Sequence, residues 1–413
     1  MGRAQRAMLV AVAVLLAAAV GCGGCRPSEP TAAQGQQEII YRPEWLSPNG
    51  RFLFMELPPI GAVAIDVSTG AQVWRSPFAD NRPYEASWSP ASDALCWWDL
   101  FGYATDEGGA VSYSSVPGGN PVQVLDADAV PELKGGWCNV CFTGPRTIAL
   151  GTHKIGDTKE APWQTTYRDV SLGDGGSPAR VTRTVRLPAG LSPHAPSHMV
   201  AIPGGHRVLV VGRDESGNGS GDGIYVVDLD HGLVIKVFDD QTSAFAASRA
   251  RWGGKLGYPY WSPLVRMASG DRWLLAVDVE IEHGGCELFA LTVDGKPVAE
   301  DLGAVVAGLA PGAVLPQGKG FVFAMFVPGV KVSAPGGEQP AVNLCLLDPK
   351  LQVVRKLTEG PTRDDRPLWS AAAGRVIFRR DMREIWSVSL NGGDARRVWS
   401  PDAGAAPEGD KQR

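Results

Sequence analysis

The feature that most constrains the fold is a short segment that recurs along the chain. Each copy has an apolar run that ends near a tryptophan, a tight turn rich in proline or glycine, and a second apolar run. Proline presets the backbone for a turn and glycine tolerates positive φ, so each copy predicts two short strands joined by a tight turn. The clear copies span residues 42–54, 86–95, 258–275 and 366–378, and weaker ones begin near Val140, Met199 and Val314.

A second signature follows each copy. It is a strand with period-two alternation that ends in another turn, and a more polar strand such as residues 353–357 closes the unit. Seven copies of a four-strand unit, spaced about 40–60 residues apart, predict an all-β fold: a β-propeller of about seven four-stranded blades, with six or eight blades as alternatives. The alternating strands span residues 63–70, 113–119, 167–176, 225–232, 288–295, 344–350 and 385–393.

The pattern Pro-x-Trp-Ser-Pro, complete at residues 259–263, resembles the TolB-type and WD-type propeller repeats of bacterial envelope proteins. The resemblance covers about residues 40–400 and implies a propeller fold. The TolB family usually has six blades where this chain predicts seven, so a TolB role is not carried over. We expect the repeated tryptophans to pack between blades. They are Trp45, Trp88, Trp261 and Trp369.

Residues 1–21 have the organisation of a signal peptide. Arg3 and Arg6 precede an apolar run over residues 7–20, which is too short to span a bilayer comfortably. The sequence Ala19-Val20-Gly21-Cys22 resembles the lipobox of bacterial lipoproteins. That resemblance implies a Cys22 that carries lipid and acyl chains such as palmitate, and an anchor on the extracytoplasmic side of a membrane in the cell envelope. An ordinary secretory leader is the alternative.

The remaining boundaries follow from composition. Residues 22–37 are rich in Gly, Pro, Gln, Ala and Ser and predict a flexible tether, residues 38–400 contain the repeats, and residues 401–413 predict a disordered tail. The formal net charge is −5, so no basic surface is available for nucleic acid.

The predicted binding face lies at the end of the propeller that carries the long loops. Blade connectivity places the turns inside the first hairpins at one end and the longer connections at the other, where binding residues usually gather. The alternative is that the loop aromatics cap blade edges or plug the channel. The candidate residues are Trp98, Phe101, Tyr103, Trp163, Trp252 and Phe326.

Residues 214–222 have the spacing of a calcium loop. Asp214, Ser216, Asn218 and Asp222 supply oxygen atoms at positions one, three, five and nine, and glycine stands near the middle. The segment resembles the calcium loops of integrin α-subunits, although Tyr225 stands where an EF-hand has its bidentate glutamate. We expect weak calcium binding or, alternatively, a flexible glycine-rich hairpin loop.

No catalytic motif is visible in the sequence. Cys138 and Cys141 have redox-motif spacing but lie in a predicted strand, which points them to opposite faces. There is no His-Glu-x-x-His, Gly-x-Ser-x-Gly or phosphate-loop motif. We therefore expect no enzyme, no catalytic residue and a scaffold that binds an envelope protein or a cell-wall component. The alternatives are a hydrolase or lyase with carboxylates that line the channel, and a sensor of a small ligand.

Overall fold

The computed structural model divides the chain into two units, Met1–Gln36 and Gln37–Arg413. The described residues all belong to the second unit, so the predicted signal peptide, Cys22 and the tether lie outside them. The structure describes residues 38–401 except 59–60, 77–81, 101–108, 134–136, 155–163, 174–178, 187–190, 193–198, 215–222, 240, 258–263, 268–271, 281–283, 295–296 and 335–336.

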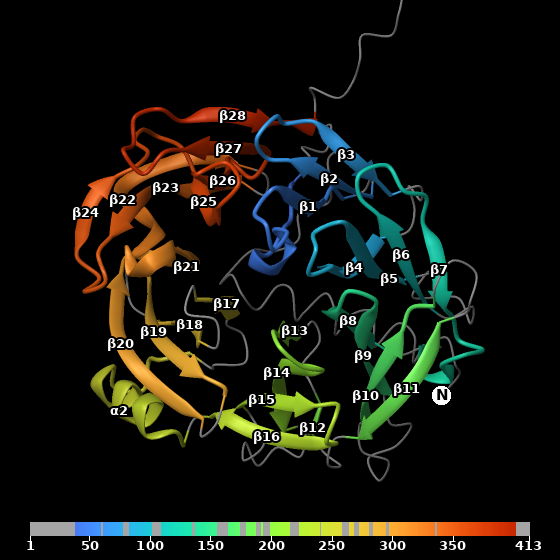
Figure 1. Ribbon diagram of the computed structural model, residues 1–413. Coiled ribbons are helices and arrows are strands. Elements are labelled where there is room, and N and C mark those ends of the chain that lie inside the picture. Colours follow the sequence, from blue (N-terminus) through green and yellow to red (C-terminus); the bar gives the residue numbers. More distant parts are fainter. Residues whose placement is uncertain are drawn as a thin grey trace, which may run out of the picture. The chain divides into compact units, whose positions relative to one another are not determined.

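Seven antiparallel sheets follow one another around a central axis, as Figure 1 shows from one end. The predicted all-β propeller with seven blades is confirmed. Within each blade the strands follow one another outward from the axis in sequence order. No helix in the described part of the chain has the length and apolar character needed to cross a membrane.

The first three blades occupy residues 40–186. Blade 1 begins with η1 (Pro43–Trp45), and Ile40 and Leu46 bridge to the strand β1 in place of a regular innermost strand. The strands are β1 (Phe52–Glu56), β2 (Ala62–Asp66) and β3 (Gln72–Arg75) in blade 1; β4 (Arg82–Trp88), β5 (Ala94–Leu100), β6 (Ala110–Ser115) and β7 (Val122–Leu125) in blade 2; and, after η2 (Pro131–Leu133), β8 (Trp137–Gly144), β9 (Thr147–Lys154), β10 (Gln164–Ser171) and β11 (Arg180–Arg186) in blade 3.

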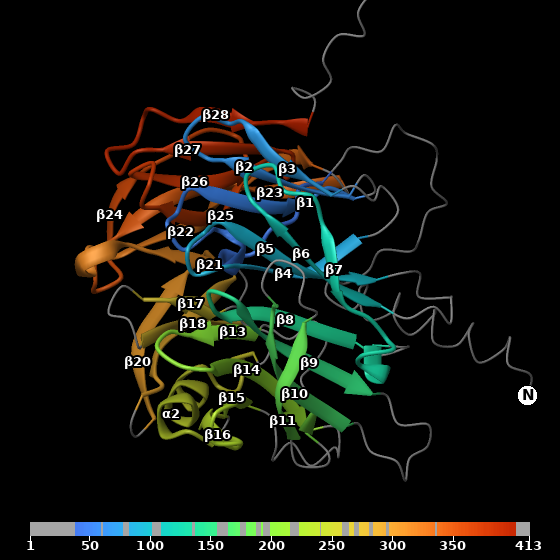
Figure 2. The same cartoon turned by 45° about the vertical axis from the view of Figure 1, so that its right-hand side comes forward.

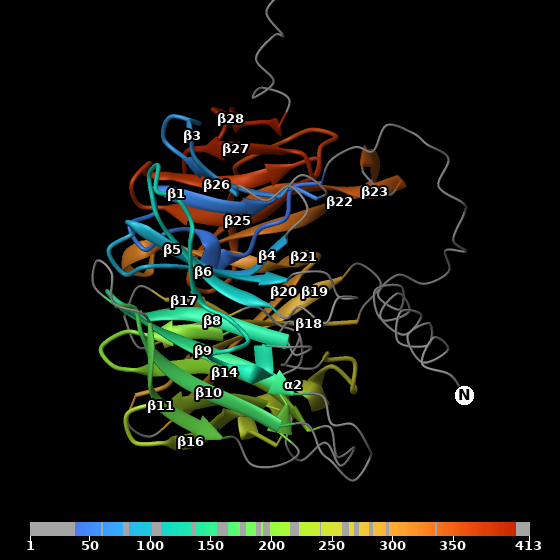
Figure 3. The same cartoon turned by 90° about the vertical axis from the view of Figure 1, so that its right-hand side faces the viewer.

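The other four blades continue to Trp399, and Figures 2 and 3 show them from the side. In blade 4, β12 (Leu191–Ser192) and β13 (Met199–Ile202) share the innermost position because both pair with β14 (Arg207–Asp214). The remaining elements are β15 (Gly223–Asp228), β16 (Leu233–Phe238), α2 (Ser243–Arg251), β17 (Leu264–Arg266), β18 (Arg272–Asp278), β19 (Gly285–Thr292), β20 (Val298–Val306), β21 (Gly308–Val314), η4 (Pro316–Gly318), β22 (Phe321–Ala334), β23 (Gly337–Leu347), β24 (Val353–Lys356), β25 (Asp364–Ser370), β26 (Arg375–Arg380), β27 (Glu384–Val388) and β28 (Arg396–Trp399).

The hydrophobic core consists of layers between neighbouring blades. Every residue of β1 and of β2 is buried, because both faces of a blade are covered by other blades. One cluster joins blades 7, 1 and 2, and five further clusters fill the contacts from blade 2 round to blade 7. A blade therefore has no independent core, and its stability depends on its two neighbours.

The repeated tryptophans include residues that pack between blades. The Trp88 ring stacks on Phe52 of the preceding blade with ring centroids 5.7 Å apart, and Trp88 Nε1 donates a hydrogen bond of 2.7 Å to the Trp45 carbonyl. Trp45 is buried and contacts Phe54 edge to face. Trp369 is half-buried at the centre of the ring, and Trp261 lies outside the described residues.

Blade 7 and blade 1 close the ring without a shared strand. All four strands of blade 7 come from the C-terminal part of the chain, and residues 40–46 bridge only to strand β1 in their own blade. Besides the apolar cluster, polar contacts join the two blades: Tyr41 Oη donates to the Arg366 carbonyl at 2.8 Å, and an Arg366 guanidinium nitrogen donates to the Tyr41 carbonyl at 2.6 Å.

Arg379 is the centre of this seam. Its guanidinium makes two hydrogen bonds to the Asp365 carboxylate, at 2.7 and 2.9 Å, and two more to Glu38 and the Ile39 carbonyl. Burial acts to raise the pKa of Asp365, but the charges of Arg379 and Arg363 outweigh it and hold that pKa below its usual range. The pair is charged, buried and fully engaged in hydrogen bonds, which is the condition under which a buried ion pair is stable.

We predict that Arg379→Met lowers the free energy of unfolding by about 3–5 kcal/mol, because it leaves the buried Asp365 carboxylate without its main partner. Chemical denaturation followed by tryptophan fluorescence measures the change. Lys331→Ala is the control: Lys331 pairs with Glu338 on the surface, where both side chains are about 70% exposed, and a surface pair contributes about 0–1 kcal/mol. Equal losses in the two variants would contradict a structural role for the seam.

Candidate functional site

A cavity of about 980 Å³ lies at the centre of the ring, at the end formed by the turns of the first hairpins. This volume is at the upper end of the range found for small-molecule sites. All seven blades contribute to its lining, for example with Leu46, Trp88, Phe142, Ile202, Trp273, Val314 and Trp369.

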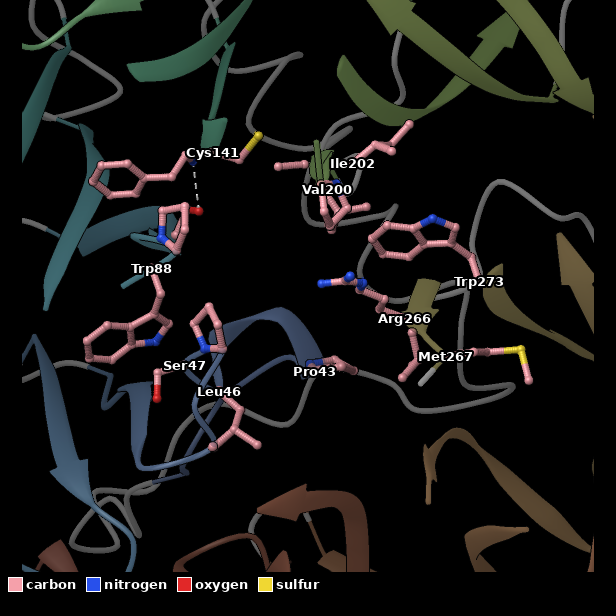
Figure 4. Close-up of a pocket in the computed structure, with 18 of the residues that line it drawn as sticks. Pro43, Leu46, Ser47, Trp88, Cys141, Val200, Ile202, Arg266, Met267 and Trp273 are labelled. Atoms are coloured by element: carbon pink, nitrogen blue, oxygen red, sulfur yellow. Dashed lines mark hydrogen bonds between the residues drawn. The ribbon is translucent and has the colours of Figure 1, made fainter. Parts of the chain in front are cut away.

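The walls are apolar because of how the innermost hairpins turn. Each inner strand ends near the axis, and the turn that follows presents prolines and backbone at the rim, such as Pro48, Pro90, Pro145 and Pro203. Aliphatic and aromatic side chains at the ends of the inner strands line the cavity next to these turns. Figure 4 shows Trp88, Val200, Ile202 and Trp273 around the hollow.

Two ionisable side chains other than cysteine occur among the described residues of this lining, Arg266 and His206. Arg266 ends β17 and pairs in register with Trp273 of β18, and Met267 N donates to the Arg272 carbonyl at 2.8 Å. Figure 4 shows the Arg266 guanidinium reaching toward the middle of the cavity. The described lining contains no aspartate or glutamate, so the carboxylates expected under the enzyme alternative do not line this part of the channel.

His206 lies next to the buried carboxylate of Asp169. It follows the tight turn of the first hairpin in blade 4, where its carbonyl accepts a hydrogen bond of 2.9 Å from Leu229 N. Its Nδ1 atom lies 3.3 Å from Asp169 Oδ2 of blade 3 and 3.5 Å from Asp230 Oδ1. His206 thus lies at the rim of the cavity, with Nδ1 near two carboxylates and without a hydrogen bond to either of them.

Asp169 is an unusual residue for this position in a β-blade. It lies on β10, is 3% exposed, and accepts a hydrogen bond of 2.7 Å from Thr182 Oγ1. Its second oxygen is buried and has no hydrogen-bond partner among the described residues, and His206 Nδ1 is likewise buried without one. Buried polar atoms in this state are uncommon and often mark functional positions. Asp230, by contrast, is about 39% exposed and is paired with Arg183 at 2.7 Å.

The Cys138 and Cys141 thiols lie on opposite faces of β8, as the strand geometry predicted. Cys138 belongs to the core between blades 2 and 3, and Cys141 to the core between blades 3 and 4. Both are free thiols, and burial raises the pKa of each well above its usual value. Cys141 also borders the cavity, but its thiol is 3% exposed.

The predicted binding face belongs to the other end of the ring, since its loops connect second strands to third ones or, at Trp252, one blade to the next. Trp98 is 1% exposed and packs between blades 2 and 3. Trp252 follows α2 and donates through Nε1 to the buried Glu287 carboxylate at 2.5 Å, and Phe326 is half-buried against the core of blades 6 and 7. Phe101, Tyr103 and Trp163 lie outside the described residues, and the face remains a prediction.

The predicted calcium loop also remains a prediction. Asp214 ends β14, and Ser216, Asn218 and Asp222 lie outside the described residues. Elsewhere in the described part of the chain, no group of three or more His, Cys, Asp or Glu side chains is placed to hold a metal ion.

Comparison with known proteins supports the fold through solved structures. No protein-family model matches the sequence, and no curated protein matches it. The β-propeller domain of the Trilobed protease from Pyrococcus furiosus, described as having an open velcro topology, matches with a TM-score of 0.50 at 14% identity, over 84% of this chain and 94% of that one. An oligogalacturonate lyase in complex with manganese matches with a TM-score of 0.54 at 10% identity, over 86% of this chain and 90% of that one. A prolyl endopeptidase matches with a TM-score of 0.51 at 12% identity over 88% of this chain, which spans only 49% of that protein.

These likenesses correct one expectation. The sequence shows no catalytic motif, and we expected from it that the chain is not an enzyme. That expectation is wrong, since these similar propellers belong to a protease, a lyase and a prolyl endopeptidase, which point toward enzymes. At these identities the likeness shows the fold, a propeller that hydrolases, lyases and scaffold domains share.

His206, Asp169 and Arg266 belong to no motif in the sequence. Asp169 and His206 are 37 residues apart and meet only where blade 3 contacts blade 4. The one local signal was the position of His206 directly after the turn Pro203-Gly204-Gly205, which ends an innermost hairpin. A residue that directly follows the turn of a first hairpin lies at the end of the central channel, so an ionisable residue there is a candidate for the site.

The burial of Cys141 generates a prediction. Because the thiolate is the reactive form and burial raises the pKa of this thiol, we expect iodoacetamide to alkylate Cys141 at least about a hundredfold more slowly in the folded protein than in the unfolded chain. Peptide mapping by mass spectrometry after timed labelling at neutral pH, with and without guanidinium, measures the ratio. Rapid alkylation of folded Cys141 would show that the cavity presents a reactive thiolate.

Proposed function

We propose that this chain is a hydrolase or lyase whose substrate occupies the central cavity, and that His206 transfers the proton. The observation that carries this proposal is the position of His206 on the cavity lining, with Nδ1 3.3 Å from the buried Asp169 carboxylate. The enzyme propellers with similar folds support the same reading.

The proposed roles follow from the geometry of the imidazole. With Nδ1 directed at Asp169, the proton is held on that nitrogen, and Nε2 is the nitrogen left to accept a proton from water or from substrate. Asp169 then orients the ring and stabilises the imidazolium that forms. The 3.3 Å separation is longer than a good hydrogen bond, and such contacts shorten when a substrate closes the site.

The burial of Asp169 strengthens its effect on His206. A carboxylate that is 3% exposed acts through a medium of low dielectric constant, where charge interactions are stronger than in water. Asp230 is more exposed and shares its charge with Arg183, so its influence on the imidazole is weaker. The residue that positions His206 is therefore Asp169.

We further propose that lipid on Cys22 attaches the enzyme to the extracytoplasmic side of a bacterial membrane. The charged and apolar leader and the sequence Ala19-Val20-Gly21-Cys22 support this. An envelope protein or a cell-wall component would then be the source of its substrate.

The catalytic prediction concerns His206. The test uses p-nitrophenyl butyrate as a hydrolase probe and oligogalacturonate as a lyase probe, and we expect the protein to turn over one of the two. For that probe, His206→Gln should lower kcat/KM by about 10²–10⁴-fold, as expected for loss of a general base. Asp169→Asn should lower kcat, since an amide in place of the carboxylate no longer fixes the tautomer of the imidazole.

His231 is the matched control. It also has a carboxylate partner, with Nδ1 3.0 Å from Asp228 Oδ2, but it is 72% exposed and does not line the cavity. His231→Gln should retain full activity. Turnover that survives in His206→Gln, or absence of turnover with both probes, would contradict the proposal.

The prediction for the anchor is a loss of labelling. An alkyne analogue of palmitate fed to bacteria that express the full chain should label the wild-type protein, and Cys22→Ser should abolish the label and release the protein from the membrane fraction. Cys25→Ser is the control, since Cys25 lies three residues beyond the lipobox. Equal labelling of wild type and Cys22→Ser would exclude the anchor.

A further inference from the structure

The inference concerns α2, the helix that connects blade 4 to blade 5, and it does not depend on the proposed catalytic function. Two carboxyl groups of blade 5 hold the C-terminal end of this helix. We infer that this contact is a pH-sensitive latch, which is closed in acid and releases the end of α2 as the pH rises. The latch consists of Arg251, Trp252, Glu287 and Asp301.

The start of α2 is fixed by apolar packing. Phe245 is 1% exposed, and its ring centroid lies 5.6 Å from that of Phe238 on β16 and 5.9 Å from that of Phe289 on β19. All three rings belong to the core between blades 4 and 5. Figure 1 shows the helix on the outside of the ring, beside β20. This contact involves no ionisable side chain, so it stays in place when the pH changes.

The end of α2 is held by polar contacts instead. Arg251 Nη2 donates to Glu287 on β19 and, at 2.8 Å, to Asp301 on β20. Trp252 Nε1 donates to the second oxygen of Glu287 at 2.5 Å. The last residue of the helix and the residue that follows it therefore both depend on Glu287.

The two carboxyl groups share one proton. Glu287 and Asp301 are hydrogen-bonded to each other, and because carboxylates are acceptors only, such a bond requires a proton on one of them. Burial raises the pKa of Glu287, whose side chain is fully buried, above its ordinary value of 4.5. Burial also acts to raise the pKa of Asp301, but hydrogen bonds to Arg251 and Glu287 outweigh it and hold that pKa low. The shared proton therefore belongs to Glu287.

The surroundings of the latch do not compensate for loss of this proton. Among the described residues, Arg251 is the cation bonded to both carboxyl groups, and one positive charge balances one carboxylate rather than two. The other charged groups on the neighbouring elements are Asp278 on β18, Glu300 of β20 with its partner Arg272, and the exposed Lys255 after the helix.

The latch is closed in acid because Glu287 binds its proton more tightly in the folded protein than in the unfolded chain. A group with a raised pKa in the folded state contributes stability at low pH, and that contribution is lost as the pH rises through the folded pKa. Two adjacent carboxylates then repel each other in a buried place. The released segment includes Trp252, which belongs to the predicted binding face.

Hydrogen–deuterium exchange of the full chain, followed by mass spectrometry from about pH 5 to about pH 9, measures the opening. An unstructured peptide of residues 243–257 provides the intrinsic exchange rate at each pH. We expect protection of the amides in residues 249–257 to fall at least about tenfold over this range, the factor that one pKa unit supplies. Peptides from β26 should keep their protection, which excludes global unfolding.

Glu287→Gln should keep the latch closed at every pH, because a neutral amide accepts from Trp252 and donates to Asp301. Asp301→Asn should also remove the pH dependence, since no second carboxylate remains to repel Glu287, and it serves as the test if Glu287→Gln does not fold.

Glu300→Gln and Asp278→Asn are the matched controls and should keep the dependence of the wild type. Glu300 lies on the same strand as Asp301 but is 60% exposed and bonded to Arg272, and Asp278 is a nearby carboxyl group whose pKa is also raised by burial. Protection in the wild type that does not fall with pH, a fall that survives in Glu287→Gln and Asp301→Asn, or one that Asp278→Asn removes would overturn the inference.

Discussion

The fold depends on one constraint: each four-stranded blade has two apolar faces, and only another blade can cover them. Strands β1 and β2 are buried along their whole length, and the core clusters lie between blades. A sheet of this kind is unstable alone, so the copies stack until the first meets the last. The central cavity is a consequence of that closure, because it is bounded by the inner ends of all seven blades.

Closure of the ring has its own chemistry. The contact between blades 7 and 1 contains the Arg379–Asp365 ion pair and the reciprocal hydrogen bonds of Tyr41 and Arg366. No described strand crosses the seam, and the buried charges there add to the apolar cluster that joins blades 7, 1 and 2. Removal of either partner of such a pair leaves an uncompensated buried charge, which is strongly destabilising.

The site combines elements that are far apart in the sequence. His206 is brought to the cavity by the hairpin turn of blade 4, whereas the buried carboxylate 3.3 Å from it comes from the third strand of blade 3. Arg266 comes from blade 5 and faces the same space. No spacing rule links these three residues, because their proximity arises from the stacking of blades. A site of this kind therefore leaves no motif in the sequence. The expectation of a non-enzymatic scaffold depended on the absence of such motifs.

The architecture can be predicted from the sequence. Period-two alternation and the recurring Trp, Pro and Gly positions specify local strands and turns, and seven copies of one unit leave a ring as the way to bury their faces. It also placed Cys138 and Cys141 on opposite faces of one strand, since that depends only on strand geometry. Only the tertiary structure decided which residues meet. Asp169 with His206, Arg379 with Asp365, and the side chains that surround the cavity come together by packing between blades, and that packing is a property of the closed ring rather than of any one segment.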